Sequence, residues 1–308
     1  MIYNNVLEAI GHTPLIRLNR MTGPGDAEVL VKFEATNIGG SIKTRTAYNM
    51  IRGAEESGLL NADTIIVEPT SGNQGIGLAL VGAVRGYKVI IIMPDSVSVE
   101  RRKLVEHYGA QVILVPDEGD IGKCIENCLQ TALDMAAADK NVYVPQQFVN
   151  PDNNLAHKYG TALEIVEQAA GPIHGFCSGV GTGGSITGIG EIFKVLYPDI
   201  LIWAVEPENA AILSGGSIGT HIQMGIGDGI IPDNLNTEIY SDLYLVSDDE
   251  AIQTAKDLAQ KEGLLCGISS GTNVAAALAM ARKLGAGKTV VTLLPDTGER
   301  YFSTALFE

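Results

Sequence analysis

The chain has 308 residues, of which 45% are hydrophobic and 19% are charged, and this size suits one large α/β domain or two smaller ones. Lysine and arginine together number 21 against 36 acidic residues, so the net charge is −15. Such acidity disfavours nucleic acid and anionic membranes as partners, because both reward basic patches. We therefore expect a small-molecule ligand, with any anionic group held by backbone N–H groups and a few local cations.

The first residues lack a basic region followed by an apolar stretch, so no signal peptide is expected, and the apolar runs are too short to span a bilayer. Of the four cysteines only Cys124 and Cys128 lie close together, on one face of a predicted helix. We interpret them as buried thiols rather than a metal or redox pair, because no histidine or further cysteine is near. These features favour a cytoplasmic protein without a metal site.

Short β-branched runs alternate along the chain with longer amphipathic stretches. The runs predict strands at 28–33, 64–68, 88–93, 111–115, 175–178, 201–206 and 289–294. The amphipathic stretches predict helices, for example at 74–86, 99–109 and 271–285. This succession predicts an α/β fold with parallel sheets flanked by helices. A stretch with Pro and Asn at 146–154 predicts a boundary between two domains, residues 1–150 and 151–308.

Because parallel sheets bind ligands at the carboxyl ends of their strands, the loops after the predicted strands are the candidate sites. The first such loop places Lys43 shortly after the turn Gly39-Gly40-Ser41. The second is P-T-S-G-N-Q at residues 69–74, at the start of a helix. Backbone N–H groups there can hold a carboxylate or a phosphate, and simple N-capping is the plain alternative.

The third loop is the glycine-rich run 179–185, which can close around a phosphate. It also satisfies G-x-G-x-x-G, with Glu206 following at the end of the next strand, so a nicotinamide oxidoreductase has to be weighed. A second phosphate-loop candidate, GAGKT at 285–289, is rejected because it leads into a strand and lacks the first glycine. Ser269 and Ser270 stand at the start of a late helix, where capping is the simplest role.

Five motifs occur in a fixed order: Lys43 after Gly-Gly-Ser, then P-T-S-G-N, G-T-G-G, G-I-S-S-G and L-P-D-T-G-E-R-Y. In this order they resemble the fold type II (tryptophan synthase β-like) pyridoxal-phosphate enzymes, and most of all the cysteine synthase (O-acetylserine sulfhydrylase) and cystathionine β-synthase family. The resemblance runs from IGHTPLIRLN to ERYFSTALF. It implies two α/β domains, a smaller N-terminal one whose first segment crosses to the other domain and a larger C-terminal one that binds the cofactor phosphate.

The resemblance also implies pyridoxal 5′-phosphate as cofactor, with Lys43 as the catalytic residue that forms the Schiff base. It implies further cofactor contacts from Asn73, Gly181, Thr182, Gly183, Gly184, Ser185 and Ser269. It assigns the substrate carboxylate to Thr70, Ser71, Gly72, Asn73, Gln74 and Gln147. A homodimer is implied, and a serine acetyltransferase is a possible partner. The implied reaction is β-replacement or β-elimination on a small L-amino acid, through an aminoacrylate.

The sequence departs from the family pattern at several positions. Ile38 and Thr44 replace a proline and an aspartate near the lysine, and Gln74 replaces a threonine in the carboxylate loop. Asp228, in GIGDGIIP, stands where the family has a small apolar residue. A solvated loop carboxylate is its plainest interpretation. We hypothesise instead that Asp228 is a second catalytic residue, which activates water so that L-cysteine yields hydrogen sulfide and L-serine.

Five alternatives to this reaction stay open. Three are reactions of the same family: plain cysteine synthesis, use of O-phosphoserine, and a cystathionine β-synthase-like replacement. From other classes, a NAD-dependent oxidoreductase does not explain Lys43. A non-catalytic binding homologue does not explain why Lys43, Asn73 and Ser269 are all retained.

Overall fold

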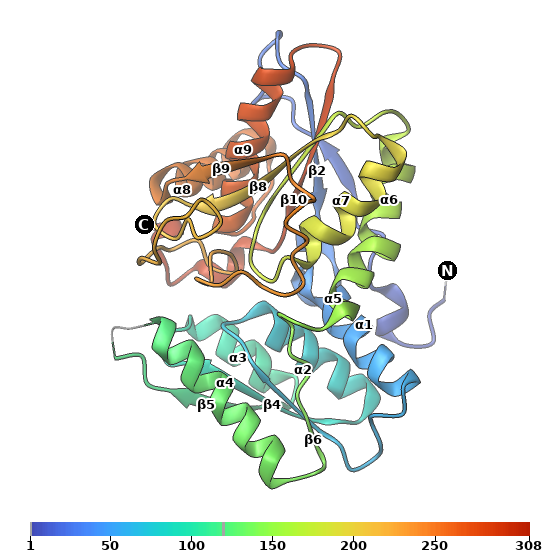
Figure 1. Ribbon diagram of the computed structural model, residues 1–308, viewed down its shortest axis with the longest axis vertical. Coiled ribbons are helices and arrows are strands. Elements are labelled where there is room, and N and C mark those ends of the chain that lie inside the picture. Colours follow the sequence, from blue (N-terminus) through green and yellow to red (C-terminus); the bar gives the residue numbers. More distant parts are fainter. Residues whose placement is uncertain (1, 119–120) are drawn as a thin grey trace.

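The molecule is built on two sheets, each in its own lobe (Figure 1). The computed structural model describes residues 2–118 and 121–308. The larger sheet has the strand order β1 (Leu15–Arg17), β2 (Glu28–Phe33), β10 (Thr289–Leu294), β7 (Gly175–Gly179), β8 (Leu201–Pro207) and β9 (Asp242–Val246). The smaller sheet has the order β5 (Gln111–Val115), β4 (Lys88–Pro94), β3 (Ile65–Pro69) and β6 (Val142–Tyr143).

Helices flank both sheets. In the smaller lobe they are α1 (Lys43–Glu56), α2 (Asn73–Arg85), α3 (Val99–His107) and α4 (Ile121–Ala138). In the larger lobe they are α5 (Pro151–Ala156), α6 (Ala162–Ala169), α7 (Gly184–Leu196), α8 (Asp248–Asp257) and α9 (Ile268–Leu284). Short 3-10 helices lie at Val6–Ala9, Glu34–Thr36, Ile38–Gly40, Gly298–Tyr301 and Ala305–Phe307, and π-helical turns at His157–Thr161 and Leu258–Glu262.

The larger sheet is buried on both faces, which explains why its strands are continuous β-branched runs. On β2, Val29 and Val31 belong to the apolar cluster that contains α9, whereas Leu30 belongs to the cluster that contains α7. Strand β2 also pairs with β10 in parallel along its whole length, from Glu28 opposite Thr289 to Phe33 opposite Leu294. The first two strands therefore belong to the larger lobe, the chain next builds the smaller lobe, and it then returns to the larger one.

The structure confirms the predicted α/β class with parallel sheets. All seven predicted strands form, and β1–β2 is the antiparallel pair in an otherwise parallel larger sheet. Strands β1, β6 and β9 were not predicted, because they are short or lie outside clear β-branched runs. Within residues 2–118 and 121–308, no helix is both long and apolar enough to cross a membrane.

Candidate active site

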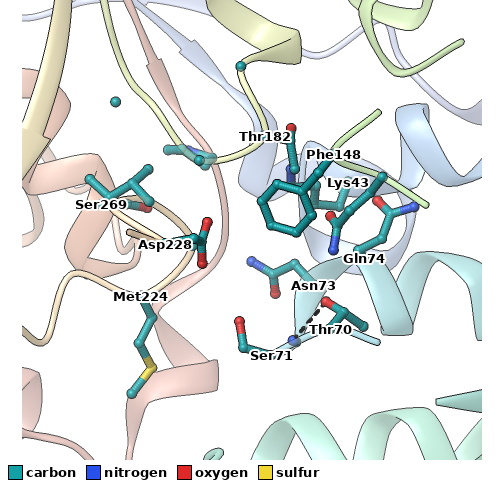
Figure 2. A pocket seen from close by; sticks show the side chains of 18 of the residues that line it. Lys43, Thr70, Ser71, Asn73, Gln74, Phe148, Thr182, Met224, Asp228 and Ser269 are labelled. Atoms are coloured by element: carbon teal, nitrogen blue, oxygen red, sulfur yellow. Dashed lines mark hydrogen bonds between the residues drawn. The ribbon is translucent and has the colours of Figure 1, made fainter. Parts of the chain in front are cut away.

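A cavity of about 290 Å³ lies between the two lobes, at the carboxyl ends of β3, β7 and β10. Every site residue predicted from the sequence lines it except Gly184, the first residue of α7. Figure 2 shows Lys43, Asn73, Asp228 and Ser269 around this one space, although they come from four distant parts of the chain. The folding of two sheets against each other therefore brings together the loops that the sequence singles out.

Lys43 is the first residue of α1, and the turn before it depends on glycine. Gly39 and Gly40 adopt left-handed φ values of 78° and 71°, and a Cβ on Gly39 would lie 2.7 Å from Thr44 Oγ1. Burial lowers the pKa of Lys43 to about 8, against the opposing charges of Asp228 and Glu68. Its Nζ lies 3.4 Å from Thr182 Oγ1. The side chain is therefore a buried amine with one weak contact, and its pKa lies much nearer to physiological pH than that of an ordinary lysine.

The run 179–185 joins β7 to α7 and forms a cup of backbone N–H groups. Gly183 is the N-cap of α7 with a φ of 77°, and no side chain caps the helix there. A Cβ on Gly181 would lie 2.4 Å from Gly225 O, and a Cβ on Gly184 would lie 2.1 Å from Asn153 Oδ1. Only glycine fits at these close approaches. The free N–H groups and the helix dipole suit a phosphate.

The loop 70–74 joins β3 to α2, and its residues face in different directions. Ser71 is exposed, and Thr70 Oγ1 accepts a hydrogen bond from Gly72 N at 3.3 Å. Asn73 donates to Asp296 Oδ2 at 2.7 Å and accepts a hydrogen bond from Arg300. The L-P-D-T-G-E-R-Y segment after β10 therefore orients the Asn73 amide.

Gln74 turns toward α1 rather than standing free in the cavity. Its Oε1 accepts a hydrogen bond from Thr46 Oγ1 at 2.7 Å. Its Nε2 is buried and has no hydrogen-bond partner in the part of the chain that the structure describes. The Gln74 amide therefore links the loop to the lysine-bearing helix through its oxygen, and its Nε2 has no acceptor among the described residues.

Asp228 lies in the loop between β8 and β9, flanked by glycines. Gly225, Gly227 and Gly229 all have left-handed φ values, between 69° and 93°. The His221 imidazole lies 3.0 Å from Gly227 O through its Nε2 and helps to hold this loop. Asp228 Oδ2 would lie 3.4 Å from a Cβ on Gly181, so the carboxylate borders the phosphate cup. Burial raises its pKa, while Lys43 and His221 act in the opposite direction.

The comparisons with known proteins fit this site. A family model described as "Pyridoxal-phosphate dependent enzyme" matches residues 6–296. The chain belongs to this family. It is 44% identical over 305 residues to a cysteine synthase of Staphylococcus aureus, covering 99% of this chain and 97% of that protein.

Solved structures show the same relationship. O-ureido-L-serine synthase superposes with a TM-score of 0.94 at 39% identity, over all of this chain and 96% of that one. A hydrogen sulfide-producing enzyme superposes with a TM-score of 0.90 at 37% identity, over 98% of this chain and 90% of that one. That enzyme is an aspartate-to-asparagine mutant in complex with an α-aminoacrylate intermediate.

The cavity of this pyridoxal-phosphate-dependent enzyme fits its cofactor. It combines a buried amine at Lys43 with an uncapped, glycine-lined helix N-terminus at the cup, which suit the aldehyde and the phosphate. Ser269 is buried at the start of α9 and lines the cavity on the side opposite Lys43 in Figure 2. Lys43, the cup and Ser269 therefore line one cavity, and the roles that the resemblance implies for them stay predictions.

The nicotinamide oxidoreductase alternative is wrong, because the matching family is a pyridoxal-phosphate one. The structure explains the misleading pattern. The glycines of G-x-G-x-x-G form the cup, and the Glu206 carboxylate accepts the backbone N–H groups of Leu213 and Ser214 at 2.7 and 3.1 Å. Glu206 is therefore a loop anchor, and it does not border the cavity.

Sequence reasoning missed several residues that line the cavity, among them Glu68, Arg101 and Met224. Glu68 directly precedes the carboxylate loop, and its position before Pro69 is the one signal that pointed to it. Arg101 is buried, with its guanidinium 4.7 Å from the centre of the Tyr301 ring and near the Met224 sulfur. Nothing local in the sequence marks this contact between the lobes.

Proposed function

We propose that this cysteine synthase-like enzyme acts as an L-cysteine lyase, converting L-cysteine and water to hydrogen sulfide and L-serine. The observation that carries the proposal is Asp228, a carboxylate that faces the same cavity as Lys43 (Figure 2). A carboxylate whose pKa is raised by burial can accept a proton near neutral pH. Water needs such a base, whereas sulfide is a good nucleophile without one.

Each step has a residue to perform it. The loop 70–74 and Gln147, which line the cavity together with Lys43, would hold the substrate carboxylate and leave the Cα hydrogen to the Lys43 amine. Pyridoxal phosphate, when bound, supplies the electron sink that makes this hydrogen acidic. Lys43 takes the proton from Cα, and the Cβ–S bond breaks with the sulfur leaving as sulfide.

Asp228 then acts in the second half of the reaction. It takes a proton from water while the oxygen bonds to Cβ, and Lys43 returns the proton to Cα. Asp228 then releases the proton that it took from water, which offsets the hydrosulfide anion that left. The balance is one cysteine and one water in, one serine and one hydrogen sulfide out. The Asp228 carboxylate also repels an incoming sulfide anion and so opposes the addition of sulfide that would form cysteine. The similar hydrogen sulfide-producing enzyme supports this assignment of elimination and water addition to different residues, because its aspartate-to-asparagine mutant holds an α-aminoacrylate intermediate.

The test is Asp228→Asn, supplied with L-cysteine, with sulfide and serine measured separately. General-base assistance contributes about 10²–10⁴-fold, so we expect serine formation to fall by about that factor while sulfide appears as a rapid burst. The matched control is Asp233→Asn, an exposed carboxylate five residues further along the same loop that does not line the cavity. Serine release by Asp228→Asn at the parent rate would make Asp228 a bystander.

The pH dependence gives a second check. Because the pKa of Asp228 is raised from 3.8, its basic form is lost as the pH falls through that raised value. Serine formation should therefore decline toward acid at a higher pH than an ordinary aspartate would give. The part of the decline that is due to Asp228, as distinct from that due to Lys43 and Glu68, should be absent from the residual activity of Asp228→Asn.

Cysteine synthesis is the second candidate, and the 44% identity to a cysteine synthase over 99% of the chain favours it. Product analysis with acetylserine, phosphoserine, serine and cysteine offered separately, with and without sulfide, distinguishes these reactions. Phosphoserine use and a cystathionine β-synthase-like replacement are outcomes of the same assay. A homodimer and a serine acetyltransferase partner stay proposals from the resemblance, and a cytoplasmic location stays a proposal from the sequence features.

A further inference from the structure

Glu68 is a fully buried carboxylate that lines the active-site cavity and has no part in the steps above. It is the second-last residue of β3. Its Oε2 accepts a hydrogen bond from the backbone N–H of Gln146, and its Oε1 accepts one from the backbone N–H of Gln147, both at 2.9 Å. The carboxylate thus holds two consecutive peptide groups of the segment that passes between the lobes.

The segment that Glu68 holds is strained. Gln146 has a φ of 57°, in the left-handed region that residues other than glycine and asparagine seldom adopt. Such a conformation persists only where its surroundings impose it. The two bonds to Glu68 come from this residue and the next, so they oppose relaxation of the turn.

The other side of Gln147 is held by the larger lobe. Its carbonyl oxygen accepts hydrogen bonds from Asn153 Nδ2 and Asn234 Nδ2, both at 2.8 Å. Asn153 Nδ2 also lies 3.0 Å from Thr182 Oγ1, the hydroxyl nearest the Lys43 amine. With its N–H and its carbonyl both held, the Gln147 backbone has one position relative to the cup and the lysine.

We propose that Glu68 is a positioning residue, which aims Gln147 at the substrate carboxylate by gripping the two backbone N–H groups of the Gln146–Gln147 turn. The proposal rests on the role of Gln147 under the proposed function. A carboxylate offers an acceptor oxygen to each N–H, whereas the amide of Glu68→Gln offers one acceptor and turns an NH₂ group toward the other N–H. Loss of the carboxylate should therefore release the turn without changing the shape of the side chain.

A matched control exists in the larger lobe. Glu206 is the second-last residue of β8, in the same Val-Glu-Pro triplet as Glu68, and it is also buried. It grips the backbone N–H groups of Leu213 and Ser214 but does not line the cavity. Glu206→Gln therefore removes the same kind of interaction at a distance from the substrate.

The experiment measures the Kd of L-alanine, a substrate-like amino acid without a leaving group, from the change in cofactor absorbance of the holoenzyme. Burial raises the pKa of Glu68 to about 7, so the titrations are run at pH 8, where the carboxylate is ionised. Hydrogen bonds to charged groups predict a loss of about 10- to 100-fold in affinity for Glu68→Gln. Gln147→Ala should weaken binding similarly, and Glu206→Gln should leave it unchanged.

The double variant Glu68→Gln/Gln147→Ala decides whether one residue acts through the other. If Glu68 works through Gln147, the double variant binds L-alanine no more weakly than Gln147→Ala alone. Additive losses, an unchanged Kd for Glu68→Gln, or an equal loss in Glu206→Gln would each overturn the proposal.

The outcomes also separate this proposal from the function on which it rests. If Gln147→Ala weakens binding and Glu68→Gln does not, the positioning role alone fails. If Gln147→Ala leaves the Kd unchanged, the carboxylate role of Gln147 fails, and the positioning role fails with it. Should Glu68→Gln not fold, Glu68→Asp replaces it under the same criteria, because it keeps a carboxylate at the buried position but is one methylene shorter and cannot reach both N–H groups.

Discussion

Arg45 lies at the centre of a buried cluster of charges that anchors the lysine-bearing helix α1. Its side chain is 5% exposed and pairs with two carboxylates: its Nε lies 2.8 Å from Glu34 Oε2, and its Nη1 lies 2.6 Å from Glu164 Oε1. Lys32, fully buried, contacts Glu164 at 2.7 Å. We predict that Arg45→Met, which removes the charge but keeps an apolar stem, strongly destabilises the protein.

The magnitude follows from what the substitution leaves behind. Glu34 is fully buried, and without Arg45 it keeps hydrogen bonds from Thr13 and Asn37 but loses the cation that contacts it. Removing one partner of a buried ion pair costs about 3–5 kcal/mol of unfolding free energy.

The pKa of Glu164 gives a second magnitude for the same cluster, to which Arg45 and Lys32 both contribute. Burial acts to raise its pKa, but Arg45 and Lys32 outweigh burial and hold the pKa at about 2 instead of 4.5. This difference corresponds to about 3 kcal/mol. Because the folded-state pKa is lowered, the contribution is complete above pH 4.5 and is lost as the pH falls toward about 2. At neutral pH Glu164 is ionised, so Arg45→Met should show the full loss of unfolding free energy.

The assay is chemical unfolding at neutral pH, with Arg52→Met as the control. Arg52 lies on the same helix, but its side chain is 50% exposed and its Nε lies 3.6 Å from Glu56 Oε1. An exposed pair of this kind contributes about 0–1 kcal/mol. If the unfolding free energies of the two variants agree within about 0.5 kcal/mol, a difference too small for a buried ion pair, the reasoning is refuted.

Two further predictions concern the cofactor and the packing of the larger lobe. Borohydride reduction of the holoenzyme should attach the cofactor to the peptide that contains Lys43, and mass spectrometry of a digest that finds it elsewhere would contradict the assignment. Gly271→Ala should lower the unfolding free energy by about 1–3 kcal/mol, because a Cβ on Gly271 would lie 1.9 Å from Ala251 O where α9 packs on α8. Gly171→Ala, whose nearest atom would be 3.8 Å away, is the control and should change it by less than about 0.5 kcal/mol.

The sequence by itself determined the principal strands and the class of the fold. Buried parallel strands need β-branched residues on both faces, so runs such as 88–93 and 289–294 are recognisable without partners. Glycine-rich loops are also recognisable, because close approach and positive φ restrict the residue type. Since parallel strands bring their carboxyl ends to one edge, these loops could be expected to converge on one site.

Tertiary structure alone decided which polar groups meet. The Asn73 amide is held by Asp296 and Arg300, and Gln74 turns to Thr46, because the lobes assemble in one particular way. Such pairs join residues far apart in the chain, so no local periodicity encodes them.

The two Val-Glu-Pro triplets show the limit most clearly. Glu68 and Glu206 have the same neighbours in sequence, end equivalent strands and grip two backbone N–H groups each. Only Glu68 borders the cavity, because β3 ends at the interface between the lobes beside the Lys43 helix, whereas Glu206 and the two residues that it holds, Leu213 and Ser214, do not line it. Local chemistry sets what a carboxylate can bind, and the packing of the two sheets sets what that binding controls.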